Sequence, residues 1–159
     1  MKLYGVALAL VGALFVWVAT TAASLGKYAA GYTLPIIFAE ASAIPMLIML
    51  LSMVFMIAVV IVTLVNAVGG PRNRNGEIIL RTLSILPILL GVLGGLYGEM
   101  NTRMAMAAAG VTRIDIIAPS RIEALTTVGF GAFAGFVALA GATLLYARWK
   151  RRPAAVEAG

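Results

Sequence analysis

Four long stretches of the chain are almost purely apolar, and the polar residues gather between them. A helix that crosses the hydrocarbon core of a bilayer, about 30 Å thick, needs about 20 apolar residues, because each residue adds about 1.5 Å and every backbone polar group must be hydrogen-bonded within the helix. The stretches that meet this requirement are Leu3–Leu25, Ile44–Val68, Ile79–Gly98 and Ala124–Ala147. The pattern predicts an all-α integral membrane protein with four transmembrane helices in one domain, residues 1–152, and a flexible C-terminal tail, residues 153–159.

The first apolar stretch admits a second interpretation. Lys2 precedes the run, and the small residues Thr21–Ser24 are similar to the cleavage site of a secretory signal. An uncleaved run of this length can span a bilayer, and we therefore interpret it as a retained first helix.

The composition is typical of a membrane protein and excludes most ordinary active sites. Hydrophobic residues make up 62% of the 159 residues and charged residues only 11%, whereas soluble domains have roughly one quarter charged residues. The chain has no Cys and no His, which excludes disulfides, thiolate nucleophiles, Cys/His zinc sites, histidine bases and histidine-ligated haem. No nucleophile and base can be paired in one plausible pocket. We therefore expect neither an enzyme nor a metal or cofactor site.

The net charge of +6 is better explained by membrane topology than by nucleic acid. Lys and Arg that flank transmembrane helices are retained on the cytoplasmic side. With four spans, one face of the membrane receives a large basic excess: Lys2, Arg72, Arg74, Arg81, Arg148, Lys150, Arg151 and Arg152 against Glu77 and Glu157. The other face receives a balanced set: Lys27, Arg103, Arg113, Arg121, Glu40, Glu99, Asp115 and Glu123. This asymmetry predicts a multi-pass membrane protein with both termini in the cytoplasm.

The connections between the predicted helices differ in kind. Gly69–Gly76 has the Gly, Pro and Asn residues of a tight turn, so the second and third helices should be close neighbours. The connection from Glu99 to Ile122 is longer and contains Met104–Ala109, a helix-forming run. We expect this run to extend the third helix beyond the bilayer until Gly110 ends it.

Small residues recur at three- and four-residue spacing on the third and fourth predicted helices. They are Gly91, Gly94, Gly95 and Gly98 on the third helix, and Gly131 and Gly135 on the fourth. Such stripes let helix backbones approach closely, which makes these glycines candidates for helix packing. The same small faces would also leave room for water in a pore, and the sequence leaves both interpretations open. The first two helices are bulkier, which suits lipid contact and outer packing.

Glu123 is the most informative acid, because it stands where the fourth predicted helix begins. Ser120 and Glu123 have the Ser-x-x-Glu spacing of a capping box, in which each side chain binds the other residue's amide. The alternative is a polar role at the mouth of a pore, shared with Thr126 or Thr127 one turn on. Glu123, Thr126 and Thr127 are therefore the candidates for an ion path or an interface.

The stretch from Leu83 to Arg152 resembles the MotA/TolQ/ExbB proton-channel family in the order and spacing of several motifs. Leu93–Met100 is similar to the family's Leu-Gly-Thr-Val-x-Gly-Ile-Met segment. Three further segments occur in the same order and at similar spacing as the family's motifs Leu-Ala-x-x-Gly, Ala-Pro-Gly and Glu-Ala-Leu-x-x-Thr. They are Ala107–Gly110, Ile117–Pro119 and Glu123–Leu125, with Thr127 and Gly131 after them.

This resemblance implies a pentamer that surrounds two helices of a small single-span partner such as MotB, TolR or ExbD, with proton flow at the interface. In that family the partner carries the proton-accepting Asp. The surrounding subunit supplies small residues, threonines and a glutamate, which map onto Gly94, Gly98, Glu123 and Thr127.

The sequence supports two functional hypotheses. The first is a small inner-membrane subunit that forms an oligomer and works with a partner membrane protein in ion-motive-force coupling. The second is a non-conducting structural or accessory subunit of a larger membrane complex, because the family's pore threonines are replaced by Gly95 and Val128 and its cytoplasmic domain is reduced to a short connection. A small-solute transporter has less support, since no intramembrane charge or broken helix offers a binding residue.

Overall fold

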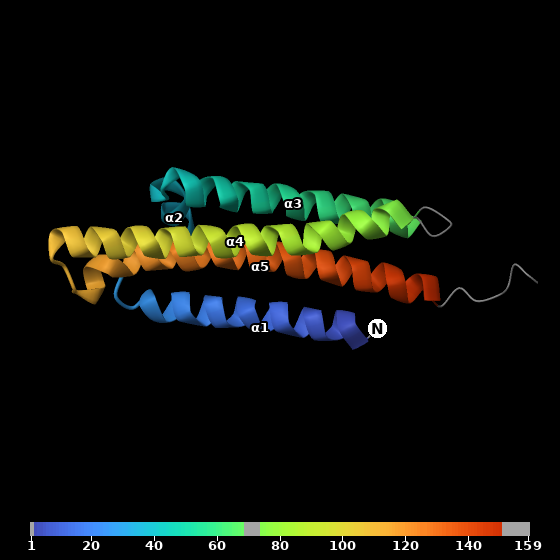
Figure 1. Ribbon diagram of the computed structural model, residues 1–159, viewed down its shortest axis with the longest axis horizontal. Coiled ribbons are helices and arrows are strands. Elements are labelled where there is room, and N and C mark those ends of the chain that lie inside the picture. The colour runs from blue at the N-terminus through green and yellow to red at the C-terminus, as the bar shows by residue number, and fades with distance from the viewer. Residues whose placement is uncertain (1, 69–73, 151–159) are drawn as a thin grey trace, which may run out of the picture.

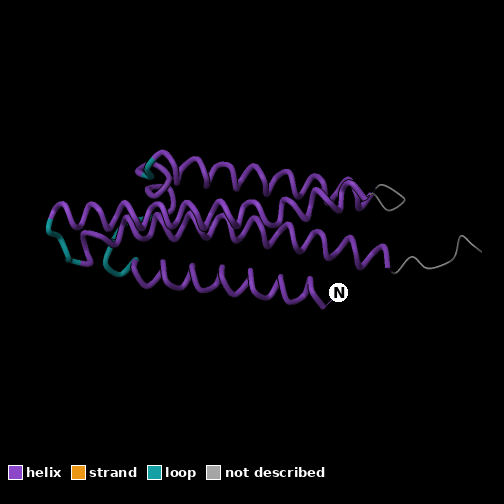
Figure 2. Tube along the Cα trace, viewed as in Figure 1, coloured by secondary structure: helices purple, strands orange, loops and turns teal. Residues whose placement is uncertain are grey.

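The computed structural model describes residues 2–68 and 74–150, and these residues form helices joined by turns. In chain order the helices are α1 (Lys2–Leu25), α2 (Leu34–Glu40), α3 (Ala43–Val68), α4 (Arg74–Ala109) and α5 (Ile114–Lys150). Figure 2 traces this path and shows no strand in the described part of the chain.

α5 is the central helix of the bundle. It packs against α4 along much of its length and also contacts α1 and α3, whereas α1 packs mainly on α5. In Figure 1, α4 and α5 run side by side through the middle, with α3 on one side and α1 on the other. The start of α1 and the end of α5 lie at one end of the bundle, and the turn between α4 and α5 lies at the other, which we call the hairpin end.

Four of these helices, α1, α3, α4 and α5, are long and apolar enough to cross a membrane, which confirms the four predicted apolar helices and supports a multi-pass membrane protein. The bounds of α1 and α3 agree with the prediction to about one residue at each end. Only 6% and 17% of the residues in their most apolar windows are buried, against 33% and 50% for α4 and α5. α1 and α3 are therefore the outer helices, and α4 and α5 form the inner pair.

α4 is longer than the predicted span and projects at the hairpin end. It continues past Gly98 and ends at Ala109. Gly110 adopts a left-handed φ of 64°, and the amide of Val111 donates to the carbonyl oxygen of Met106 at 3.2 Å, an arrangement that ends many helices. The predicted extension of this helix and its end at Gly110 are confirmed.

α5 begins at Ile114, and the predicted start at Ala124 was wrong. Pro119, which we expected before the helix, lies inside it and costs one backbone hydrogen bond. The segment is helical because Ala118 is completely buried and because Asp115 places a carboxylate in the first turn, where it complements the helix dipole. Tertiary packing thus outweighs the local preference of the proline.

α2 is a short helix that the hydrophobic pattern did not predict. Pro35 lies in its first turn, where a missing amide hydrogen costs nothing. Ile37 is buried against Met49 of α3 and Ile122 of α5. This contact fastens the connection between α1 and α3 to the central helix at the hairpin end.

Two predictions concern residues outside the described ranges. The tight turn at Gly69–Gly76 lies partly outside them, and the flexible tail, residues 153–159, lies wholly outside them. α3 and α4, the helices that the turn joins, pack against each other as predicted.

Candidate functional site

The three predicted polar candidates, Glu123, Thr126 and Thr127, lie on adjacent turns of α5 but do not form one cluster. Successive residues of an α-helix point about 100° apart, so neighbours in the sequence face different parts of the protein. Each candidate contacts a different element.

Glu123 binds the connection between α2 and α3. Its Oε1 accepts a hydrogen bond from the backbone amide of Ser42 at 3.0 Å and a second from the Ser42 hydroxyl at 2.8 Å. Ser42 directly precedes α3, and its carbonyl oxygen accepts the first bond of that helix, from the amide of Met46 at 3.0 Å. The carboxylate therefore links the hairpin-end part of α5 to the start of α3, and charge-assisted bonds of this type are stronger than neutral ones.

The capping box predicted between Ser120 and Glu123 is wrong. Ser120 lies inside α5 instead of at its first residue, so its amide belongs to the helical ladder. Glu123 does stabilise a helix start, but the helix is α3 and the residue it holds is Ser42.

Thr127 faces α4 and is completely buried. Its hydroxyl donates to the carbonyl oxygen of Glu123, one turn earlier, at 3.0 Å. Its methyl group packs on α4, because a Cβ placed on Gly94 would lie only 2.8 Å from Thr127 Cγ2. Within the described chain this threonine fills a helix contact and satisfies its own hydroxyl.

Thr126 faces a cavity between α1 and α5. The cavity has a volume of about 650 Å³, is partly open to the outside, and is bounded by α1, α5 and the segment that includes α2. Its lining residues are apolar except for Thr126 and Tyr32. Burial, followed by the nearby carboxylates of Glu123 and Glu40, raises the pKa of Tyr32 above its usual value of 10.0. The Tyr32 hydroxyl is therefore neutral at physiological pH.

The glycines of α4 and α5 bring the two backbones into contact. A Cβ placed on Gly131 would overlap the carbonyl oxygen of Pro87 and lie 2.8 Å from Gly91 Cα. A Cβ placed on Gly91 would lie 3.0 Å from Gly131 Cα. Since real Cβ atoms are practically never found closer than about 3 Å to another heavy atom, neither position accepts a side chain without movement of a helix.

The other four predicted glycines lie in the same α4–α5 contact. A Cβ on Gly98 would lie 2.9 Å from the Ala124 Cβ, and Gly94 faces Thr127 as described above. The remaining contacts are Gly95 with Val128, and Gly135 with the carbonyl oxygen of Ser84 and the side chain of Ile88. In the described part of the chain these glycines are thus occupied by packing between α4 and α5.

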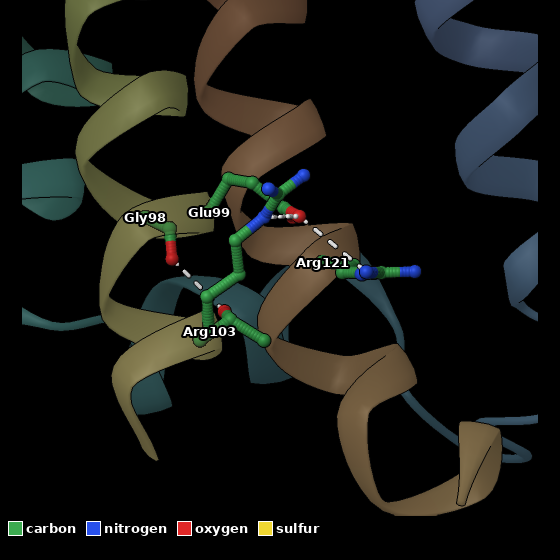
Figure 3. A network of polar contacts seen from close by, with 5 residues as sticks. Gly98, Glu99, Arg103 and Arg121 are labelled. Carbon is green, nitrogen blue, oxygen red and sulfur yellow. Dashed lines mark hydrogen bonds and ion pairs between the residues drawn. The ribbon is translucent and has the colours of Figure 1, made fainter. Parts of the chain in front are cut away.

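Glu99 joins α4 to α5 where the hairpin leaves the rest of the bundle (Figure 3). Its Oε1 accepts from Arg103 Nε at 2.9 Å and, over a longer 3.4 Å, from a terminal nitrogen of Arg121 on α5. Glu99 follows Gly98, where the predicted span ends, and α4 continues past it. The Arg103 pair lies within α4 on its exposed side, and such pairs contribute less than about 1 kcal/mol. The Arg121 pair is partly buried and is the one that joins α4 to α5.

No metal site is evident in the parts of the chain that the structure describes, because they contain no group of three or more acidic side chains close enough to hold an ion. The sequence did not predict the cavity beside Thr126. It also did not predict Ser42 as the partner of Glu123. A Ser directly before an apolar helix is a signal for a helix start, but no local pattern reveals a carboxylate far along the chain.

Comparisons with known proteins add no relative, since no family model, no curated protein and no solved structure matches the chain. The functional reading therefore depends on the geometry described above and on the sequence motifs.

Proposed function

We propose that this protein is a small multi-pass subunit of the bacterial inner membrane that acts in the assembly of a membrane complex and does not conduct ions through its own helices. The observation that supports this proposal is an exposed apolar surface on the outer side of α4. Exposed apolar residues follow it at three- and four-residue spacing from the apolar span into the projecting hairpin: Leu86, Leu89, Leu93, Leu96, Met100 and Met104. We call this set the α4 stripe.

The length of α4 distinguishes the α4 stripe from an ordinary lipid-facing surface. A helix of 36 residues is about 54 Å long, whereas the hydrocarbon core is about 30 Å thick. The hairpin of α4 and α5 extends beyond α1 and α3 in Figure 1, and the exposed Met100 and Met104 lie past Gly98, where the predicted span ends. Lipid covers apolar side chains inside the bilayer, but exposed methionines beyond it favour a protein partner.

The α4–α5 contact argues against conduction within the chain. Thr127 and the six glycines are packed between these helices, and Glu123 is bound to Ser42. A proton path needs a series of polar groups or water-filled spaces through the hydrocarbon core. The described inner pair supplies backbone contacts there instead.

The partner that we propose is a second copy of this chain, with α4 stripes packed together, so that the protein forms a homo-oligomer. The orientation follows from charge. The end of the bundle opposite the hairpin carries Arg81 and Arg148, and basic residues at helix ends favour the cytoplasmic side. In this orientation the hairpin projects away from the cytoplasm.

Copy number in the purified assembly tests this proposal. Native mass spectrometry of the full chain in lipid nanodiscs should give more than one copy, and Met104→Glu should shift the population to single chains. Ile116→Glu is the matched control, because it places the same charge on an exposed residue of α5 in the same hairpin and should leave the copy number unchanged. A single copy in the unchanged protein, or equal effects of the two variants, would contradict the proposal.

Ion-motive-force coupling is the second candidate function. It is favoured by the position of Glu123, a partly buried carboxylate at the hairpin end of the longest apolar helix, and by the resemblance to the MotA/TolQ/ExbB family. Its proton path would run at an interface with a small single-span partner that carries its own proton acceptor. Proton flux in native membrane vesicles, which retain the partner, separates the two candidates, because coupling requires a flux that Glu123→Ala lowers, whereas the assembly role predicts a flux that Glu123→Ala leaves unchanged.

A further inference from the structure

The cavity beside α5 has the chemistry of a site for a hydrocarbon chain. Its volume is about 650 Å³, which lies within the range of roughly 300 to 1,000 Å³ that is usual for ligand sites. Most of its lining is aliphatic or aromatic, with Phe15 and Val18 from α1 and Phe130 and Phe133 from α5. The cavity is open on one side, so a chain can enter it from the surrounding medium.

The cavity exists because α1 meets α5 through small residues with space between them. Ala19, Ala22 and Ala23 of α1 line it, and so does Gly129 of α5. A Cβ placed on Gly129 would lie 3.5 Å from Val18 Cγ1, an ordinary van der Waals distance. The α1–α5 contact is therefore not closed by the backbones, unlike the α4–α5 contact.

The two polar residues of the lining belong to its half nearer the hairpin end, where they stand among apolar ones. Tyr32 belongs to the connection after α1, and Thr126 lies on α5 between Ile122 and Gly129. Phe15 and Phe133 line the cavity further from the hairpin end. A molecule with a weakly polar group toward the hairpin end and a hydrocarbon tail beyond it fits this order of residues.

Water and empty space are poor occupants of this cavity. A buried water needs two to four polar partners, and two hydroxyls cannot support a volume of this size. An empty space forfeits the dispersion contacts of every side chain around it. A hydrocarbon tail restores those contacts and needs no hydrogen bonds.

We propose that the cavity binds one acyl chain of a membrane phospholipid, with the ester region near Tyr32 and Thr126 and the tail between Phe15 and Phe133. The bound chain fills the space between α1 and α5 and holds α1 to the inner pair. This proposal concerns a different surface from the α4 stripe and does not depend on the oligomeric state.

The first test asks whether a lipid stays bound when the protein is washed in detergent, and we expect that it does. The full chain is reconstituted with a phosphatidylcholine that carries a photoactivatable diazirine near the end of one acyl chain, and it is then washed in detergent. Native mass spectrometry should show a lipid that stays bound, and illumination should label Phe15, Phe130 or Phe133. Absence of a retained lipid, or label confined to the outer surface of α3, overturns the proposal.

A variant that fills the cavity provides the matched comparison. Ala22→Trp places an indole inside it, whereas Ala13→Trp places one on an exposed position of α1 that does not line it. The retained lipid should fall about tenfold or more in Ala22→Trp, which corresponds to about 1.4 kcal/mol of binding free energy, because the indole occupies the space of the acyl chain. It should stay unchanged in Ala13→Trp. Equal retention in the two variants overturns the proposal, and the labelling of the unchanged chain decides the question by itself if Ala22→Trp does not fold.

Discussion

The two sides of α5 are packed by different means. On the α4 side the contact is between backbones, with Gly91 against Gly131 and no room for a Cβ at either position. On the α1 side aromatic and small side chains surround a cavity of about 650 Å³. One helix thus combines a rigid contact, which fixes the inner pair, with an adaptable contact that another molecule can complete.

The difference between these two sides explains why the glycines of α5 should contribute unequally to the stability of the protein. A membrane helix pair lacks the hydrophobic driving force that water provides, so close van der Waals packing has to stabilise it. Glycine at the α4 contact permits that packing, whereas glycine at the cavity only leaves space. The following substitutions are ordered from the largest expected effect to the smallest.

Gly131→Ala and Gly129→Ala compare the two sides directly. At position 131 the new methyl group meets the carbonyl oxygen of Pro87 and should destabilise the protein by about 1–3 kcal/mol, as overpacking does elsewhere. At position 129 it meets Val18 at an ordinary distance, and the better helix propensity of Ala should stabilise the protein by up to about 1 kcal/mol. Reversible unfolding in sodium dodecyl sulfate measures both free energies. Equal effects would show that the sides do not differ.

Glu123→Ala removes the link between α5 and the start of α3. Loss of the two bonds to Ser42 should cost about 1–2 kcal/mol in the same unfolding measurement. Ser42→Ala should cost less, because the backbone amide of residue 42 still donates to the carboxylate. The exposed Glu40 provides the control, and Glu40→Ala should have little effect. When Glu123→Ala and Ser42→Ala are combined, the loss of unfolding free energy should be smaller than the sum of the two separate losses. A loss equal to that sum would contradict a direct interaction.

Thr127→Val tests whether the buried hydroxyl has a role beyond packing. Its partner is the carbonyl oxygen of Glu123 in the preceding turn, and the methyl group toward Gly94 is kept in valine. We expect a change in stability of less than about 1 kcal/mol and no change in proton flux. A protein whose flux depends on this hydroxyl would instead belong to the ion-coupling hypothesis.

Tyr32 gives a small effect that depends on pH. Burial and the carboxylates of Glu123 and Glu40 raise its pKa in the folded protein above the ordinary value of 10.0. Above pH 10 the unfolded chain releases this proton first, so stability should decrease as the pH rises from that value through the raised pKa. Tyr32→Phe should abolish this part of the pH dependence. The tyrosinate absorbance of the folded protein, measured with and without the substitution, locates the pKa, and a value at or below 10 would contradict the packing of this side chain.

The hydrophobic pattern predicts the coarse architecture well for physical reasons. Four apolar runs must become helices in a bilayer, and their lengths follow from its thickness. Gly110 was recognisable as a helix end, because few residues other than glycine adopt a left-handed conformation. The small-residue spacing on two helices identified the residues that lie in the closest contact of the described chain.

The polar site was less predictable because it depends on contacts between distant parts of the chain. Ser42 and Glu123 are 81 residues apart in the chain, and no local spacing encodes their contact. The early start of α5 was missed because burial of Ala118 outweighs the effect of Pro119. The separation of Thr126 from Thr127 was available from the helical period alone, since adjacent residues point about 100° apart.

The central claim is that the α4 stripe, and not the exposed apolar surface of the more hydrophobic α3, is the contact between copies of this chain. The chain contains no Cys, so single cysteines can be introduced as unique probes. Leu93 of the α4 stripe is 60% exposed and Ile57 near the middle of α3 is 59% exposed, which makes them a matched pair. In native membranes treated with a short bis-maleimide, Leu93→Cys should form cross-linked dimers and Ile57→Cys should remain a single chain. Dimers from Ile57→Cys alone, equal yields from both variants, or no cross-link at Leu93→Cys would contradict the account.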